Sequence, residues 1–249
     1  MAMKPLIIFD LNGSLVRRSK THIYLRPHLA DLLQFCFDHF AVAIWTSSEQ
    51  RNMQRMVDAA FHDKHLEFCW DRSVTLKDPT GPIAASLKNL QIVWEQFSQW
   101  GPNNTILIDD SPSKARLCPH NCALVREWSN EDVNSDSDDD LLALKEYLEW
   151  LVDENDFRDF ITNHPFHSTE MTKEMLSDVI SASEVAQLPF SKQSARTVSV
   201  TQAQPATEAL IAAANAAMDE WSKKSNSATR KYIKRYACTR PFLSICLAI

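Results

Sequence analysis

The chain has 249 residues and a mass of 28.4 kDa, which suits one domain with additional chain or two small domains. Apolar residues make up 45% of it and charged residues 23%, a globular composition that argues against wholesale disorder, collagen and a membrane bundle. The formal net charge of -6 provides no global basic field, so we expect no direct nucleic-acid partner.

Glycine is scarce, and this restricts the kinds of phosphate site that the chain can build. It has only three glycines, which excludes a Gly-rich phosphate loop or dinucleotide fingerprint, because both need several glycines close together. The six cysteines form no framework and no secretory leader precedes them, which favours reduced thiols and a nuclear or cytoplasmic location.

Strand and helix patterns alternate along the first 150 residues. Short apolar runs predict buried strands at Leu6–Leu11, Ala41–Trp45, Leu66–Trp70, Thr105–Ile108 and Cys122–Val125. Amphipathic stretches predict helices that begin after Pro27 and at Glu49, and then cover Leu87–Phe97 and Leu141–Val152. This alternation indicates an α/β fold with a doubly wound parallel sheet, in which ligands bind at the carboxyl ends of the strands.

The composition changes after Trp128. Residues 131–140 (EDVNSDSDDD) are predicted to be a solvated acidic loop, and Leu141–Val152 to be the last packed helix. We therefore expect a domain at residues 1–160 and a flexible, partly helical tail at 161–249, with one helix at 205–222.

Polar side chains follow the strongest predicted strands. Asp10 ends the first, Thr46 the second, and Asp109 and Asp110 the third, while Lys88 opens the helix predicted at Leu87–Phe97. A phosphoryl-transfer site can be assembled from these parts, with Asp10 as nucleophile and Mg²⁺ between it and the later acids. Thr46 and Lys88 would then hold the phosphoryl oxygens.

Four motifs in order resemble the haloacid-dehalogenase (HAD) phosphatases, and most closely the branch that acts on the C-terminal domain of RNA polymerase II (FCP/SCP-type, NLI-interacting-factor-like). They are Phe9–Leu15 (FDLNGSL), Trp45–Ser47 (WTS), Leu87–Leu90 (LKNL) and Ile108–Pro112 (IDDSP). Leu25–Leu29 (LRPHL) is in addition similar to that branch's L-R-P-x-L stretch, and the resemblance covers about residues 5 to 150.

The resemblance implies a role for each matching residue. Asp10 would be the nucleophile, and Mg²⁺ would be held by Asp10, by Asp110 and by the backbone carbonyl of Asn12. Asp109 would be a neighbouring metal ligand or an acceptor beside the metal. Phosphate would be held by three residues, namely Thr46, Ser47 and Lys88.

Asn12 departs from the family pattern D-x-D-x-T/V, whose second Asp protonates the leaving oxygen and then activates water. An Asn side chain does neither, and such acid–base help is worth roughly 10²–10⁴-fold in rate. Ser14 at the T/V position is a mild change. Two functions therefore stay open: a Mg²⁺-dependent protein serine/threonine phosphatase with weak turnover, and a non-catalytic module that binds phosphoproteins.

The short connection between the first two motifs suggests the substrate class. Only 35 residues separate Asp10 from Thr46, which leaves no room for a large cap domain over the site. An open site suits a phosphorylated protein or peptide better than a sequestered metabolite, with residues 71–82 as a small insert beside it. We expect the protein to be a monomer.

Two further patterns have simpler interpretations. Cys118 to Cys122 (CPHNC) lacks a second paired half, so we do not expect a zinc site there. Cys246–Ile249 (CLAI) follows a basic stretch and formally resembles a prenylation signal at Cys246, but Ile is not a preferred last residue. The related branch in the mitochondrial inner-membrane translocase would lead one to expect a presequence and a membrane span, and neither pattern occurs in this chain.

Overall fold

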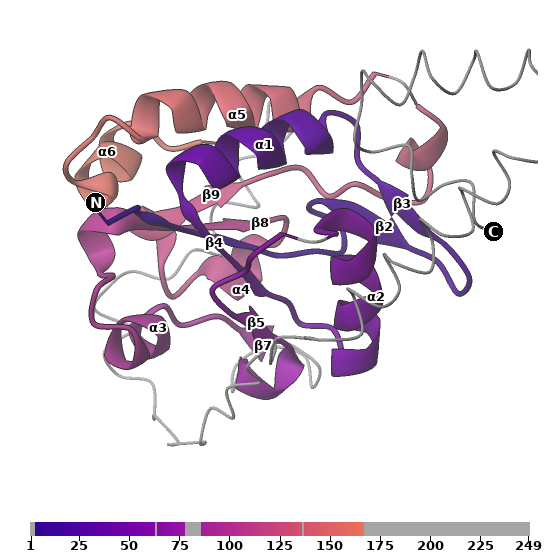
Figure 1. The fold of residues 1–249 in the computed structure, drawn as a ribbon, viewed down its shortest axis with the longest axis horizontal. Coiled ribbons are helices and arrows are strands. Elements are labelled where there is room, and N and C mark those ends of the chain that lie inside the picture. The colour runs from indigo at the N-terminus through magenta and orange to yellow at the C-terminus, as the bar shows by residue number, and fades with distance from the viewer. Residues whose placement is uncertain (1–2, 63, 78–85, 136, 167–249) are drawn as a thin grey trace, which may run out of the picture. The chain divides into compact units, whose positions relative to one another are not determined.

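A five-stranded parallel sheet forms the centre of the computed structural model, which describes residues 3–62, 64–77, 86–135 and 137–166 (Figure 1). The strand order is β5-β4-β1-β8-β9. The strands are β1 (Leu6–Phe9), β4 (Ala41–Trp45), β5 (Cys69–Trp70), β8 (Thr105–Asp109) and β9 (Cys122–Leu124). Strands β4 and β5 lie on one side of β1, and the later strands β8 and β9 lie on the other side. This order confirms the predicted doubly wound α/β fold.

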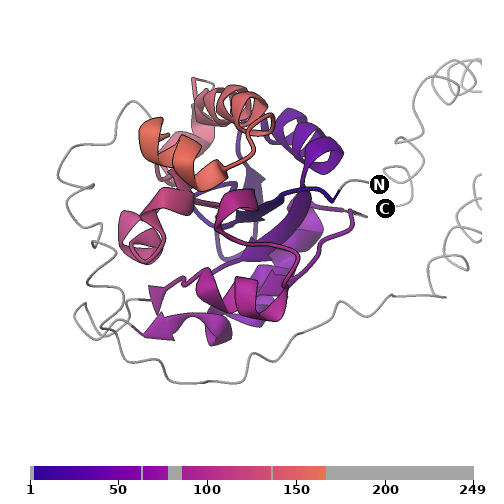
Figure 2. The same ribbon diagram turned by 90° about the vertical axis from the view of Figure 1, so that its left-hand side faces the viewer.

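Helices cover both faces of the sheet (Figure 2). Ile7 and Phe9 point into one core and Leu6 and Ile8 into the other, because successive side chains of a strand face opposite sides. The first core contains residues of α1 (Leu29–His39), α2 (Gln50–Ala60), α5 (Asp140–Leu151) and α6 (Phe157–Asn163). The second contains residues of α3 (Gln91–Gln96) and α4 (Pro112–Ala115). Both faces being buried explains why the strands are continuous apolar runs.

Two short antiparallel strand pairs lie outside the sheet. They are β2 (Val16–Arg18) with β3 (Ile23–Leu25), and β6 (Leu76–Lys77) with β7 (Ser86–Leu87). The β2–β3 pair and α1 occupy the connection between Asp10 and Thr46, so no cap domain is inserted there. Short 3₁₀ turns complete the described elements, at Arg72–Val74, Pro102–Asn104, Pro119–Asn121 and Asp132–Asn134.

Three of the predicted elements were wrong. The helix expected from Leu87 begins only at Gln91, because Leu87 pairs with Leu76 as a strand. Helix α5 is not the last packed element, since Phe157 and Ile161 of α6 are buried in the same core. The stretch Asp71–Pro82, whose composition predicts a loop, holds a 3₁₀ turn and β6 in its described part, residues 71–77.

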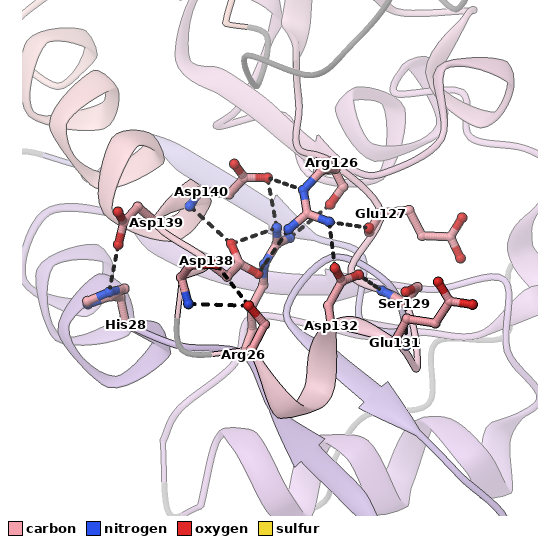
Figure 3. Close-up of polar contacts among 12 residues, drawn as sticks. Arg26, His28, Arg126, Glu127, Ser129, Glu131, Asp132, Asp138, Asp139 and Asp140 are labelled. Carbon is pink, nitrogen blue, oxygen red and sulfur yellow. Dashed lines mark hydrogen bonds and ion pairs between the residues drawn. The ribbon is translucent and has the colours of Figure 1, made fainter.

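The acidic segment is partly packed, although a solvated run is predicted: Asp138 is buried, whereas Glu131, Ser137 and Asp139 are exposed (Figure 3). Asp138 is 4% exposed, and its two carboxylate oxygens accept hydrogen bonds from Arg26 Nε at 2.8 Å and Nη2 at 3.2 Å. Arg26 Nη2 also donates to Asp140 at 2.8 Å, and Arg126 donates to Asp132 at 3.1 Å. These five residues are called the Arg26 cluster below. Arg26 belongs to the LRPHL motif, which thereby acquires a structural role.

The Arg26 cluster joins segments that are distant in sequence. Arg26 Nη1 donates to the backbone carbonyls of Ser14 and Arg126, both at 3.0 Å. The loop after β1 is therefore fastened to the segment after β9, and the backbone N–H of Trp128 donates to Gly13 O at 2.7 Å beside it.

The boundary predicted at residue 160 falls inside helix α6, and the tail with its expected helix at 205–222 lies outside the described residues. None of the described helices has the length and apolar character needed to cross a membrane.

Candidate functional site

The carboxyl ends of β1, β4 and β8 bring the predicted site residues to one edge of the sheet. Phe9 is level with Ile44 on one side and with Ile108 on the other, so the residues after these positions emerge together. The backbone N–H of Asp10 donates to Ile108 O at 2.9 Å, which fixes Asp10 beside Asp109. Thr46 follows β4 at the same edge.

Lys88 lies between two of the carboxylates. Its Nζ is 2.9 Å from Asp10 Oδ1 and 2.5 Å from Asp109 Oδ2, and all three side chains are almost completely buried. Burial alone would lower the pKa of Lys88, but Asp10 and Asp109 raise it above its ordinary value. Burial likewise opposes ionisation of Asp109, yet Lys88 and then Lys114 hold the pKa of Asp109 below its usual range. Both groups are therefore charged at neutral pH.

Lys88 does not open a helix, as the sequence predicted, but follows β7. Its backbone N–H donates to Lys114 O at 2.9 Å, which anchors it next to α4. The β6–β7 pair thus carries the lysine toward the carboxylates from outside the central sheet.

Asp110 is the least satisfied carboxylate of the group. Ser14 Oγ approaches its Oδ1 at 3.4 Å and Lys114 Nζ at 3.7 Å, both long for interactions of a buried charge. Burial, and after it the charges of Asp109 and Asp10, raise the pKa of Asp110 to about 8. Gly13 has φ 96° and its backbone packs so closely on Asp110 that a Cβ at this position would collide with the carboxylate.

Carboxylate oxygens of Asp10, Asp109 and Asp110 lie within 4.8 Å of one another, and this is the metal-competent group found among the described residues. An all-oxygen donor set with excess negative charge fits a hard cation such as Mg²⁺. Both oxygens of Asp109 already accept hydrogen bonds, Oδ2 from Lys88 Nζ and Oδ1 from the backbone N–H of Ser111 at 2.9 Å. Asp10 and Asp110 have more free coordination capacity. Together with Lys88 and Lys114, these carboxylates are called the Asp10 cluster below.

The Asn12 side chain is held in place by the neighbouring strand. Its Oδ1 accepts a hydrogen bond from the backbone N–H of Arg18 at 3.0 Å. A carboxylate oxygen could accept the same bond, so an Asp at this position would fit without rearrangement.

Thr46 and Ser47 make local contacts at the end of β4. Thr46 is buried, and its Oγ1 accepts a long hydrogen bond from the backbone N–H of Ser48 at 3.3 Å. Ser47 Oγ lies 2.8 Å from Ser86 Oγ, which connects this strand end to the β6–β7 pair. Their predicted contact with phosphate stays a prediction.

Lys114 is the site residue that the sequence analysis missed. It lies 4.0 Å from Asp109 and 3.7 Å from Asp110, and the carboxylates, Asp109 first, raise its pKa against the effect of burial. A signal was available in the sequence: Lys114 lies four residues after Asp110, and Pro112 between them is typical of the first residue of a helix, where such a spacing brings the two side chains together.

Residues 5–158 match the model of the family described as NLI interacting factor-like phosphatase. The match covers well over half of the chain and includes every residue of the Asp10 cluster. The chain belongs to this family, whose CTD phosphatase-like domain has the HAD fold, which confirms the resemblance seen in the sequence motifs.

Related proteins extend the comparison. An uncharacterized FCP1 homology domain-containing protein of Schizosaccharomyces pombe is 29% identical over 189 residues, which cover 66% of this chain and 78% of that protein. The human ubiquitin-like domain-containing CTD phosphatase 1 is 24% identical over 181 residues, covering 68% of this chain. That alignment spans only 56% of the human protein.

Among solved structures, Fcp1, an essential RNA polymerase II CTD phosphatase, aligns over 66% of this chain and 67% of its own, with a TM-score of 0.45 and 12% identity.

Proposed function

We propose that this protein is a Mg²⁺-dependent phosphatase-like protein that transfers the phosphoryl group of phosphoserine or phosphothreonine in proteins to Asp10. The observation that supports this most strongly is the group of three carboxylates, two of them buried, with the buried Lys88 at the carboxyl edge of the sheet. Membership of the NLI interacting factor-like phosphatase family supports a phosphoprotein as the substrate.

The reaction has two chemical steps. In the first, a carboxylate oxygen of Asp10 attacks phosphorus, and the bond between phosphorus and the serine or threonine oxygen breaks. The departing oxygen takes a proton from water, because Asn12 has none to give. In the second, water attacks phosphorus, releases inorganic phosphate and restores the Asp10 carboxylate.

Each neighbouring residue has a distinct task in this scheme. Lys88 orients Asp10 through its 2.9 Å contact, and its charge also faces the arriving phosphoryl oxygens. Thr46 and Ser47 would hold those oxygens at the end of β4. Mg²⁺, held by Asp10, Asp110 and the carbonyl of Asn12, would supply positive charge that offsets the phosphoryl group.

A second candidate function is a binding module that retains phosphoprotein segments without turnover. Asn12 is the observation that favours it, since Asn12 removes acid–base help while leaving the carboxylates and Lys88 in place. The hydrogen bond from Arg18 makes Asn12→Asp a near-isosteric test of the two candidates.

The discriminating experiment measures hydrolysis of p-nitrophenyl phosphate with Mg²⁺ by wild type, Asp10→Asn and Asn12→Asp. Wild-type turnover that disappears in Asp10→Asn supports the enzyme. The binding module is supported if wild type shows no hydrolysis, Asn12→Asp does hydrolyse the substrate, and Asp10→Asn/Asn12→Asp again does not. If Asn12→Asp and wild type are both silent and neither binds a phosphoserine peptide, the proposed phosphoryl site is wrong.

A further inference from the structure

A basic surface lies beside the candidate site, although the whole chain carries a net charge of -6. It consists of Arg18 and Lys20 from the β2–β3 segment and of Arg51 and Arg55 from α2. The segment from Val16 to Leu25 contains no acidic residue, and Arg51 and Arg55 are one helical turn apart and share a face of α2. These four residues are called the basic surface below.

The two elements of the basic surface pack against each other (Figure 1). Arg55 Nη2 donates to the backbone carbonyl of Thr21 at 3.4 Å, which places the helix beside the connection between β2 and β3. The four positive charges are thus brought together by tertiary structure from two separate parts of the sequence.

Both parts of the basic surface, the β2–β3 pair and helix α2, lie close to the Asp10 cluster. The backbone N–H of Arg18 donates to the side chain of Asn12, two residues from Asp10. Helix α2 begins at Gln50, four residues after Thr46 at the end of β4, so Arg51 lies in the turn nearest to the carboxyl edge of the sheet.

The charges of the basic surface are not neutralised within the described part of the chain. Arg17 on the same strand donates to Asn130 at 2.9 Å and lies 3.5 Å from Glu127, whereas Arg18, Lys20, Arg51 and Arg55 form no ion pair with a described residue. The Nε of Arg18 is shielded from solvent and makes no hydrogen bond there either. Unpaired cations beside a phosphate site attract a ligand with further negative charge.

We propose that the basic surface binds the flanks of the phosphorylated segment, and that these flanks carry acidic or additional phosphorylated residues. This inference rests on the proposed function, because it takes a phosphoserine or phosphothreonine in the Asp10 cluster as its starting point. The preferred substrate class is then an acidic phosphopeptide, selected by long-range attraction and by contacts with Arg18, Lys20, Arg51 and Arg55.

The test measures fluorescence anisotropy of four labelled peptides of equal length on the full chain, both as wild type and as Asp10→Asn. The peptides combine a central serine or phosphoserine with flanks of Asp and Glu or of Asn and Gln. We expect the acidic phosphopeptide to bind about threefold to tenfold more tightly than its amide-flanked counterpart. Higher ionic strength should reduce this ratio, because exposed charges are screened.

Charge variants locate the effect. Arg51→Gln/Arg55→Gln and, separately, Arg18→Gln/Lys20→Gln should each remove much of the preference for acidic flanks and weaken binding of the amide-flanked phosphopeptide by a smaller factor than binding of the acidic one. Lys4→Gln/Lys64→Gln is the matched control, because it removes two exposed positive charges before β1 and after α2, away from the carboxyl edge. This control should retain the full preference.

The outcomes separate the two proposals. Equal affinity of wild type for both phosphopeptides, or an equal loss in the control variant, overturns the inference while leaving the proposed function standing. Binding of the acidic unphosphorylated peptide as tight as that of its phosphorylated form also overturns it. A chain that binds neither phosphopeptide more tightly than the matching serine peptide contradicts the proposed function itself.

Discussion

Two clusters of charged side chains in this molecule, the Arg26 cluster and the Asp10 cluster, each contain two cations and three aspartates and so have the same formal charge of -1. In the Arg26 cluster, hydrogen bonds of 2.6 to 3.2 Å reach both oxygens of Asp138 and of Asp132. In the Asp10 cluster, Ser14 Oγ and Lys114 Nζ approach Asp110 Oδ1 only to 3.4 and 3.7 Å, and Asp110 also neighbours the like-charged Asp109. The two clusters differ in the completeness of their hydrogen bonding rather than in net charge, and this difference suits the Arg26 cluster to holding the fold together and the Asp10 cluster to binding a cation.

The largest expected effect is on the Arg26 cluster. Arg26→Met should lower the free energy of unfolding by about 3–5 kcal/mol, because Asp138 and Asp140 would lose their buried partner. Urea unfolding measures the change, and Arg26→Met/Asp138→Leu should recover part of it by removing the orphaned charge. If Arg26→Met lowers the free energy of unfolding by less than about 1 kcal/mol, the Arg26 cluster does not hold the fold together.

Mg²⁺ should stabilise the folded protein through the Asp10 cluster. At a concentration 100 times its Kd, the ion should add about 2.7 kcal/mol to the free energy of unfolding, since it binds only the folded state. Unfolding in Mg²⁺ and in EDTA measures the difference. If Mg²⁺ raises the free energy of unfolding of Asp110→Asn by the same amount, the ion binds elsewhere and the Asp10 cluster is not the cation site.

Without Mg²⁺, Asp110→Asn should itself be stabilising at pH 8. The pKa of Asp110 is raised to about 8 in the folded state, so between about pH 4 and 8 the folded state binds more protons than the unfolded state. Wild type should therefore lose stability as pH rises through this window, and Asp110→Asn should lose less. Parallel pH profiles of the two proteins in EDTA would refute the raised pKa.

The smallest effect should come from Arg126→Gln. The side chains of Arg126 and Asp132 are each 24% exposed, so their 3.1 Å ion pair should contribute at most about 1 kcal/mol to stability. Its backbone carbonyl still accepts from Arg26 in the variant. A loss as large as that of Arg26→Met would mean that the two arginines act as a single unit.

The sequence predicts the sheet and its acidic edge because those features are local. β4 has its predicted bounds, and β1, β8 and β9 each end within two residues of their own predicted ends. Strands that are buried on both faces consist of continuous apolar residues, so they can be recognised in the sequence. Asp10, Asp109 and Asp110 meet because parallel strands share one carboxyl edge.

What the sequence does not reveal depends on distant partners. Arg26 and Asp138 are 112 positions apart, and nothing in an acidic run shows that one of its aspartates is buried. Lys88 appeared to open a helix because Leu87 and Leu90 fit a helical face, but pairing of Leu87 with Leu76 decides the local structure. Tertiary pairing therefore overrides local periodicity where strands are only two residues long.

The most direct test of the central claim is a search for phosphate on Asp10. Wild type, Asp10→Asn and Asn12→Asp would be mixed with p-nitrophenyl phosphate and Mg²⁺, quenched in acid and mapped by peptide mass spectrometry. We expect phosphate to accumulate on Asp10 in wild type, where Asn12 cannot activate water, and Asn12→Asp to release inorganic phosphate instead. Wild type and Asn12→Asp that both lack phosphate on Asp10 and release none would contradict the assignment of Asp10 as the phosphoryl acceptor.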